Sequence, residues 1–187
     1  MIPRCSVFIA TSLDGFIARP DGSIDWLEAA NARVPAGEDC GYGAFVAGID
    51  ALVMGRRSFE TVAAFDAWPY ADLRVVVQTR RPLAIDATLA ATVTASAESP
   101  LDLARRLGTQ GARRLYIDGG ETIRRFLAAG LIDEITITTV PVLLGEGRPL
   151  FTGDGGRARE VELELLSSRS WPFGFVQSRY RVQGFPA

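Results

Sequence analysis

The chain has 187 residues, of which 48% are hydrophobic and 22% charged, a composition typical of globular proteins. Its length is sufficient for a substantial core, and we expect a single domain over residues 1–187. The formal net charge of −2 does not indicate a general nucleic-acid-binding surface. The chain contains no histidine, which excludes Ser-His-Asp or Cys-His catalysis and histidine-ligated metal, and we expect no metal site.

The two cysteines, Cys5 and Cys40, form no CxxC pair, so we expect two buried thiols in a cytoplasmic protein; a disulfide is the alternative. Asp14 and Gly15 interrupt the first apolar run, which therefore does not resemble a secretory signal. No run of 18 apolar residues predicts a membrane span.

Hydrophobic periodicity and turn residues predict alternating strands and helices along most of the chain. Strands are expected at 5–13, 51–54, 74–78, 114–118 and 133–140, with a weaker one at 89–94 and a closing antiparallel hairpin at 161–168 and 175–182. Helices are expected from Asp25, at 42–48, at 56–63, from the Ser99-Pro100 N-cap to Leu107 with Gly108 ending it, and at 121–129 with Gly130 as its C-cap. These elements predict an α/β fold whose mixed, mostly parallel sheet is flanked by helices and ends in the antiparallel hairpin.

Three predicted strands run into residues suited to phosphate. They are followed by Gly55-Arg-Arg-Ser58, by Gln78-Thr-Arg-Arg81 and by Gly119-Gly-Glu-Thr122, the last of which opens a helix. Ligands of open α/β sheets lie off such strand ends, where glycine allows close approach and a helix N-terminus supplies N–H groups. The three together predict a phosphorylated dinucleotide lying across several strand ends.

The order of these motifs resembles the dihydrofolate reductase fold, and within it the bacterial group that includes the reductase domain of riboflavin biosynthesis. The matching segments, within roughly residues 5–182, are 12–18, 25–27, 53–59, 77–80, 117–121 and 141–147. The resemblance implies an oxidoreductase that uses NADPH to reduce a small heterocyclic or sugar-linked substrate, as a 5-amino-6-(5-phosphoribosylamino)uracil reductase does. A true dihydrofolate reductase and a non-catalytic nucleotide-binding domain are the alternatives.

The resemblance also implies the cofactor-binding residues. The pyrophosphate is expected at Gly55, Arg56, Arg57 and Ser58, and the 2′-phosphate near Thr79 and Arg80. The helix that faces the phosphates is expected to begin with Glu121 and Thr122. The nicotinamide side is expected to have Ala10 together with Gly119 and Gly120, which the family joins by a cis peptide. An ordinary turn at Gly119-Gly120 and a solvated helix start at Arg56-Arg57 are the alternatives.

On the substrate side, the resemblance implies contacts from Asp14 and Trp26, with a turn aspartate and a core tryptophan as the alternatives. Dihydrofolate reductases proper carry a carboxylate about five residues after the active-site tryptophan, where this chain has neutral Asn31. We therefore expect little or no dihydrofolate reduction. Glu146 is a minor candidate for substrate contact, and Glu38 and Asp39 are expected to be solvated. No proton donor is assigned, and water is one option.

Aromatic residues gather near the C-terminal hairpin, at Trp171, Phe173, Phe175 and Phe185. This is more aromatic surface than a small domain easily buries, so we expect a homodimer held partly by this region. The alternative is that these side chains close the edge of the core.

Overall fold

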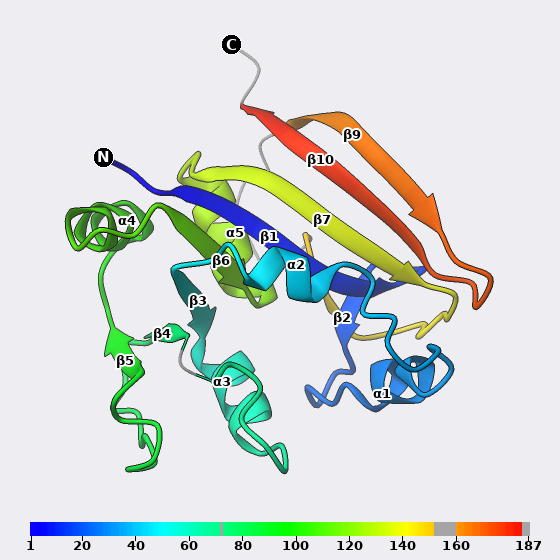
Figure 1. The fold of residues 1–187 in the computed structure, drawn as a ribbon, viewed down its shortest axis with the longest axis horizontal. Helices are drawn as coiled ribbons and strands as arrows, with labels where there is room; N and C mark the ends of the chain where they lie inside the picture. The colour runs from blue at the N-terminus through cyan, green and yellow to red at the C-terminus, as the bar shows by residue number, and fades with distance from the viewer. Residues whose placement is uncertain (72, 152–159, 185–187) are drawn as a thin grey trace.

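The computed structural model describes residues 1–71, 73–151 and 160–184, and its centre is an eight-stranded sheet of order β5-β4-β3-β6-β1-β7-β10-β9 (Figure 1). The strands are β1 (Arg4–Ser12), β3 (Ala51–Gly55), β4 (Arg74–Gln78), β5 (Val93–Ser96), β6 (Arg114–Asp118), β7 (Ile132–Val140), β9 (Glu162–Ser170) and β10 (Val176–Gly184). The first six are parallel, and β10 runs antiparallel to both β7 and β9. The predicted mixed, mostly parallel sheet with a C-terminal antiparallel hairpin is confirmed.

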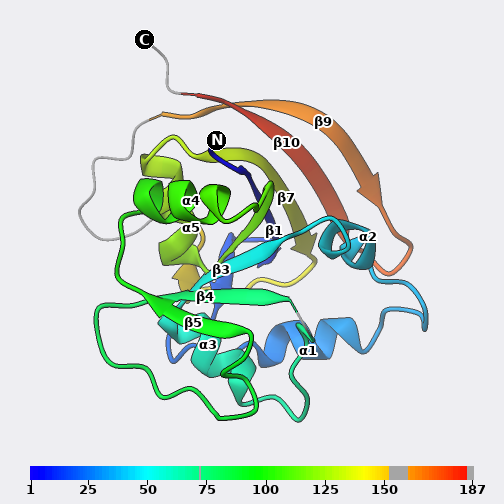
Figure 2. The ribbon, with the colours of Figure 1, turned by 60° about the vertical axis from the view of Figure 1, so that its left-hand side comes forward.

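Helices cover both faces of this sheet because successive strand residues point to opposite sides. Ala51 and Val53 of β3 face α4 (Pro100–Thr109) and α5 (Gly120–Ala128), which lie side by side (Figure 2). Leu52 and Met54 face α2 (Tyr42–Val46) and α3 (Arg56–Ala63). Both faces of the central strands are therefore buried, as their nearly continuous apolar sequence predicts.

A third apolar cluster lies where the hairpin meets α1 (Asp25–Asn31). Trp26 of α1 packs there with Val140 at the end of β7 and with Trp171 and Phe175 of the hairpin. A short two-stranded sheet of β2 (Phe16–Ala18) and β8 (Arg148–Pro149) joins the turn after β1 to the segment after β7.

Two predicted boundaries are wrong. The weak strand expected at 89–94 begins only at Val93, because Asp86 accepts the Thr88 N–H and starts a turn through Leu89. Helix α4 continues through Gly108 and ends at Thr109. Gly111, two residues later, has a φ of 96° and closes the helix end, with bonds from Gly111 N–H to the Gly108 carbonyl and from Ala112 N–H to the Leu107 carbonyl.

Gly108 has a packing role instead. A Cβ on Gly108 would lie 2.1 Å from the carbonyl oxygen of Met1, so only glycine lets the N-terminal segment cross the helix there. The predicted C-cap of α5 is confirmed: Gly130 has a φ of 66° and donates to the Leu127 carbonyl.

Both cysteines are free, with Cys5 buried and Cys40 half-buried. Within the described residues, no helix has the length and apolar character to cross a bilayer. The same residues contain no cluster of three or more cysteine, aspartate or glutamate side chains arranged to hold a metal ion.

The stability of the sheet depends on the α5 contact. Phe126 is fully buried against the sheet, and we expect Phe126→Ala to lower the free energy of unfolding by about 3–5 kcal/mol, because the substitution leaves a cavity. Phe65→Ala is the matched control, since Phe65 is 39% exposed, and we expect a change within about 0.5 kcal/mol. Urea unfolding measures both, and similar losses in the two variants would contradict this account.

Candidate functional site

Two helix N-termini lie next to each other at the carboxyl ends of the central strands. β3 and β6 are neighbours, with Met54 paired to Asp118, so the turns that follow them are adjacent. Helix α3 begins directly after Gly55 and α5 directly after Gly119. The N-cap residues of both helices are glycines, which have no side chain to cap the helix, whereas Ser99 caps α4 by accepting the Asp102 N–H. The first-turn N–H groups of α3 and α5 are therefore suited to an anion.

The two turns touch each other, and glycine makes that contact possible. A Cβ on Gly119 would lie 2.3 Å from Ser58 Oγ, and one on Gly55 would lie 3.1 Å from Thr122 Oγ1. Gly119 also has a φ of 81°, a left-handed conformation that favours glycine. Four of the predicted phosphate-site residues are thus brought together.

The peptide expected to be cis is trans, as are all the peptides of the described residues. Positive φ at Gly119 makes the turn instead. Gly120 is buried against the chain itself: a Cβ there would lie 2.9 Å from Ile17 Cδ1 and 3.5 Å from the Pro149 carbonyl oxygen. The β2–β8 sheet thus packs directly against the start of α5.

The arginines of this edge have different surroundings. Arg56 pairs with Glu60 at 2.6 Å and donates to the Pro82 carbonyl, so it links α3 to the segment after β4. Arg57 and Arg80 are exposed and form no ion pair within the described residues. Thr79 shapes the turn that carries Arg80, because its hydroxyl bonds both the N–H and the carbonyl of Arg81.

One further residue on this edge, Arg125, was not predicted from the sequence. Arg125 of α5 donates to the side-chain oxygen of Gln78 at 3.2 Å, which joins the helix to the end of β4. Arg125 lies inside a helical segment, so only the fold brings it to the strand end. Glu121 is the reverse case: it was predicted at the site, but its side chain is 74% exposed and pairs with Arg124.

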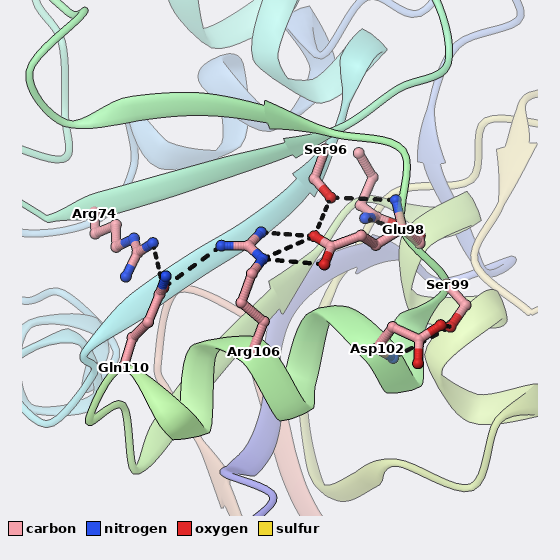
Figure 3. Close-up of polar contacts among 8 residues, drawn as sticks. Arg74, Ser96, Glu98, Ser99, Asp102, Arg106 and Gln110 are labelled. Carbon is pink, nitrogen blue, oxygen red and sulfur yellow. Dashed lines mark hydrogen bonds and ion pairs between the residues drawn. The ribbon is translucent and has the colours of Figure 1, made fainter.

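Polar contacts around Glu98 fix the end of β5, and this group of contacts is called the Glu98–Arg106 buttress below (Figure 3). The Glu98 carboxylate accepts bonds from both nitrogens of the Arg106 fork and from Ser96 Oγ, and these bonds hold its pKa below the ordinary range. Thr79 N–H donates to the Ser96 carbonyl, so the buttress also supports the turn before Arg80.

On the substrate side, the structure brings two of the predicted residues together. Ala10 packs on the cluster that contains Trp26, which is 4% exposed and whose indole N–H has no partner among the described residues. Asn31 is exposed at the end of α1. The roles predicted for these residues in substrate binding stay predictions.

Asp14 fastens two distant segments. Its carboxylate accepts bonds from Ser12 Oγ at 2.6 Å, from the Leu144 N–H at 3.1 Å and from the Gly145 N–H at 2.8 Å. These donors hold the pKa of Asp14 below its usual range, with the Ser12 bond as the largest cause. The carboxylate thus ties the turn after β1 to the segment 141–147, where Glu146 is exposed.

Glu38 and the hairpin aromatics do not match the predictions. Glu38, expected to be solvated, accepts the Trp171 indole N–H at 2.9 Å. Asp39 is exposed, as predicted, and accepts the N–H groups of Gly41 and Gly43. Trp171 and Phe175 are buried in the third cluster, so they close the core and form no exposed patch. Phe185 lies outside the described residues.

Asp118, the last residue of β6, is a further candidate that the sequence analysis missed. Burial raises the pKa of its carboxyl to about 6, although the Gly119 N–H and the Tyr116 hydroxyl act in the opposite direction. The Tyr116 hydroxyl donates at 2.7 Å to the Phe8 carbonyl and lies 3.5 Å from the Asp118 carboxyl. Since a phenol has one proton and Tyr116 donates it to Phe8, the Asp118 carboxyl gains little hydrogen bonding from Tyr116.

A cavity of about 270 Å³ lies at the opposite end of the sheet, where Arg4, Asp133 and Arg181 line it. It is separated from the glycine turns by the length of the strands and takes no part in this arrangement.

Asp118 makes the folded protein less stable as the pH rises. Its folded pKa of about 6 exceeds the ordinary value of 3.8, so the folded chain holds the proton more tightly than the unfolded chain. Its stabilising contribution is complete below about pH 4 and is lost as the pH rises through about 6, on the order of 2–3 kcal/mol. We expect Asp118→Asn, which does not ionise, to remove this loss.

Urea unfolding of both proteins between about pH 4 and pH 7 checks this expectation. The variant should gain stability relative to the wild type with rising pH. A difference that stays constant over this range would contradict the assignment.

The strand order and the paired glycine turns define a dihydrofolate reductase-like fold, as the solved relatives show. The sequence profile of the RibD C-terminal domain family matches residues 3–176. The chain belongs to that family.

Individual relatives agree with this membership. YwjB of Bacillus subtilis (strain 168), described as uncharacterized, is 38% identical over 147 residues, which cover 78% of this chain and 80% of YwjB. A putative riboflavin biosynthesis protein from Shewanella sp. PV-4 is 36% identical with a TM-score of 0.87, over 98% of this chain and 99% of that one.

A more distant relative shares the fold. The diaminohydroxyphosphoribosylaminopyrimidine deaminase/5-amino-6-(5-phosphoribosylamino)uracil reductase of Thermotoga maritima is 14% identical with a TM-score of 0.70. The match covers 97% of this chain and 57% of that one. The predicted resemblance to the riboflavin-biosynthesis reductase group is confirmed.

Proposed function

We propose that the protein is an NADPH-dependent reductase of a small heterocyclic or sugar-linked substrate, of the kind reduced by 5-amino-6-(5-phosphoribosylamino)uracil reductases. The observation that carries the proposal is the contact between two uncapped helix N-termini at Gly55 and Gly119. That arrangement suits the paired phosphates of a dinucleotide. Membership in the RibD C-terminal domain family supports the reductase assignment.

The residues present fit the phosphates of such a cofactor. Gly55 and Gly119 let the two turns pack together, and this contact brings the hydroxyl groups of Ser58 and Thr122 to the same place. Arg57 and Arg80 add positive charge at the edge without competing ion pairs among the described residues. NADPH would supply the hydride, and the protein would bind, orient and shield the reactants.

The substrate would lie between the strand ends and α1, next to Ala10 and Trp26. The buried indole N–H of Trp26 has no partner among the described residues and would donate to a polar atom of the substrate. Asn31 supplies no negative charge for a protonated pterin, so we expect dihydrofolate to be a poor acceptor. The chemistry would take place in the cytoplasm, where both free thiols stay reduced.

Fluorescence titration with NADPH, followed by an assay of NADPH oxidation with 5-amino-6-(5-phosphoribosylamino)uracil and with dihydrofolate, tests the function. Binding of NADPH together with turnover of the first acceptor would support it. A protein that binds no nicotinamide cofactor would not be a reductase of this kind.

We expect NADPH to bind more tightly than NADH, because the Arg80 guanidinium would pair with the extra phosphate. Charge-assisted bonds of this type contribute about 1.5–3 kcal/mol, so Arg80→Ala should lose about 10- to 100-fold in NADPH affinity and little in NADH affinity. Arg113→Ala is the control, since Arg113 is exposed at the opposite end of the sheet. Equal affinities for the two cofactors in the wild type would remove Arg80 from the phosphate site.

We also propose that the protein is a homodimer that pairs through the outer edge of β9. Leu163 and Leu165 are 41% and 56% exposed, and register places them beside Val182 and Tyr180 of β10. The outer edge of β9 has backbone groups that a further strand can pair with. Glu162 and Glu164 precede the midpoint of β9 and Arg169 follows it, so antiparallel pairing of two copies brings opposite charges together.

Light scattering at micromolar concentration tests the dimer. We expect a dimeric wild type and a monomeric Leu163→Ser/Leu165→Ser variant, because the substitutions remove the apolar contact. Leu143→Ser is the control, since Leu143 is 71% exposed on the segment after β7. A monomeric wild type would refute the dimer, and a variant that stays dimeric would place the interface elsewhere.

A further inference from the structure

Arg125 of α5 is half-buried, and no carboxylate among the described residues neutralises its charge. The one hydrogen bond that its side chain makes to those residues runs from Nη1 to the side-chain oxygen of Gln78, a neutral group, at 3.2 Å. A charge that is taken partly out of water without a counter-ion costs free energy. An anion from outside the chain would lower that cost.

The helix offers Arg125 a carboxylate that it does not use. Glu121 lies four residues earlier, which is the favourable spacing and order for an ion pair along a helix surface. Glu121 pairs instead with Arg124, at 2.9 Å. The Arg125 side chain is thus directed away from a surface ion pair and toward the sheet, where it meets the end of β4.

Gln78 is fixed in the orientation that receives Arg125. It is buried at the end of β4, and its Nε2 donates to the Glu98 carbonyl at 3.4 Å, so its oxygen is left for the guanidinium. The Glu98 carboxylate is occupied by the Arg106 fork and does not bond Arg125. The end of β4 therefore holds the Arg125 guanidinium in place without compensating its charge.

The strand order β5-β4-β3-β6-β1 places Arg125 at one end of the proposed cofactor. Ala10 of β1 marks the expected nicotinamide side, and the helix N-termini after β3 and β6 suit the pyrophosphate. A dinucleotide that continues along the same edge of the sheet reaches the end of β4 with its adenosine half. Arg125 lies there, beside the turn of Thr79 and Arg80 that follows β4 directly.

We propose that Arg125 contacts the 2′-phosphate of NADPH together with Arg80 and so helps to distinguish NADPH from NADH, an inference that rests on the proposed reductase function. A guanidinium donates in a planar fork that matches two phosphate oxygens. The Gln78 contact uses one of the five N–H groups of Arg125, so the others are left for the ligand. The same contact holds the guanidinium before the ligand arrives, which lowers the entropic cost of binding.

The test compares the wild type with Arg125→Gln, which removes the charge, and with Arg125→Lys, which keeps it. Fluorescence measures the affinities for NADPH and NADH. Calorimetry measures those for adenosine 2′,5′-bisphosphate and adenosine 5′-monophosphate, two probes that differ only in the 2′-phosphate. Arg105→Gln is the matched control, since Arg105 is exposed on the neighbouring helix α4 and forms no ion pair within the described residues. Circular dichroism checks that each variant is folded.

We expect Arg125→Gln to lose about 10- to 100-fold in affinity for NADPH and for the bisphosphate, as the loss of a charge-assisted bond does. Its affinities for NADH and the monophosphate should stay within about twofold of the wild type. Arg125→Lys should lose less, because an ammonium keeps the charge but lacks the fork. The Arg105→Gln control should keep all four affinities.

A second variant, Gln78→Glu, leaves Arg125 in place and gives it a carboxylate to pair with. We expect this internal ion pair to compete with the phosphate and to weaken NADPH binding by about 10-fold, with a smaller effect on NADH. Because Arg125 stays in the protein, this result does not depend on whether Arg125→Gln folds.

Equal losses of NADPH and NADH affinity in Arg125→Gln would show a role in shaping the site or in binding the pyrophosphate, and would overturn the proposal. So would an NADPH affinity near that of the wild type in Arg125→Gln or in Gln78→Glu. Equal wild-type affinities for the two cofactors would overturn it as well, and would leave the reductase function standing. Failure of the wild type to bind either cofactor would instead reject the reductase function on which the inference rests, so the two failures are distinguishable.

Discussion

The contact between the turns after β3 and β6 is the constraint on which the rest of the site depends. Parallel pairing of the two strands brings the turns side by side, and Gly119 allows Ser58 to approach where any side chain would collide. Two helices can then begin at adjacent positions, each after a glycine that has no side chain to cap it. A larger residue in either turn would separate the helices and with them the two halves of the anion site.

The supporting contacts act at a distance from this pair. The Glu98–Arg106 buttress fixes the end of β5 and the turn that carries Arg80, while Arg125 joins α5 to Gln78. Each contact links an outer strand to a helix on the same face. Hydrogen bonds thus fix the backbone of the turn that carries Arg80, which limits the backbone entropy that binding must overcome.

Much of the fold could be predicted because the central strands are rich in β-branched residues and largely buried on both faces, as in the segment 133–140. The predicted boundaries were wrong where the same residue type can have two different structural reasons. Leu89 is apolar because it packs on the core from a turn, and Gly108 is small because Met1 crosses the helix. Trp171 was interpreted as surface because its partner Glu38 is 133 residues away in sequence.

The candidate site shows the same limit. Glycine and arginine after a strand are visible in the sequence, so Gly55, Ser58 and Gly119 could be named. Asp118 differs from any other strand-terminal aspartate only by its surroundings, and these come from α2, β6 and the segment before β4. A pKa that burial in the folded chain raises leaves no local pattern in the sequence.

The link from Asp14 to Leu144 and Gly145 has a consequence for the order in which the protein assembles and opens. The segments it joins are about 130 residues apart, and β2 pairs with β8 across the same separation. Closing so long a loop is entropically costly until the strands between the two segments have formed. The unit made of the β2–β8 sheet and the Asp14 contacts is therefore completed late in folding. By the same logic it can detach as a small cooperative unit while the sheet stays intact. Amide protons of residues 141–150 should then exchange with solvent faster than those of β3 and β6.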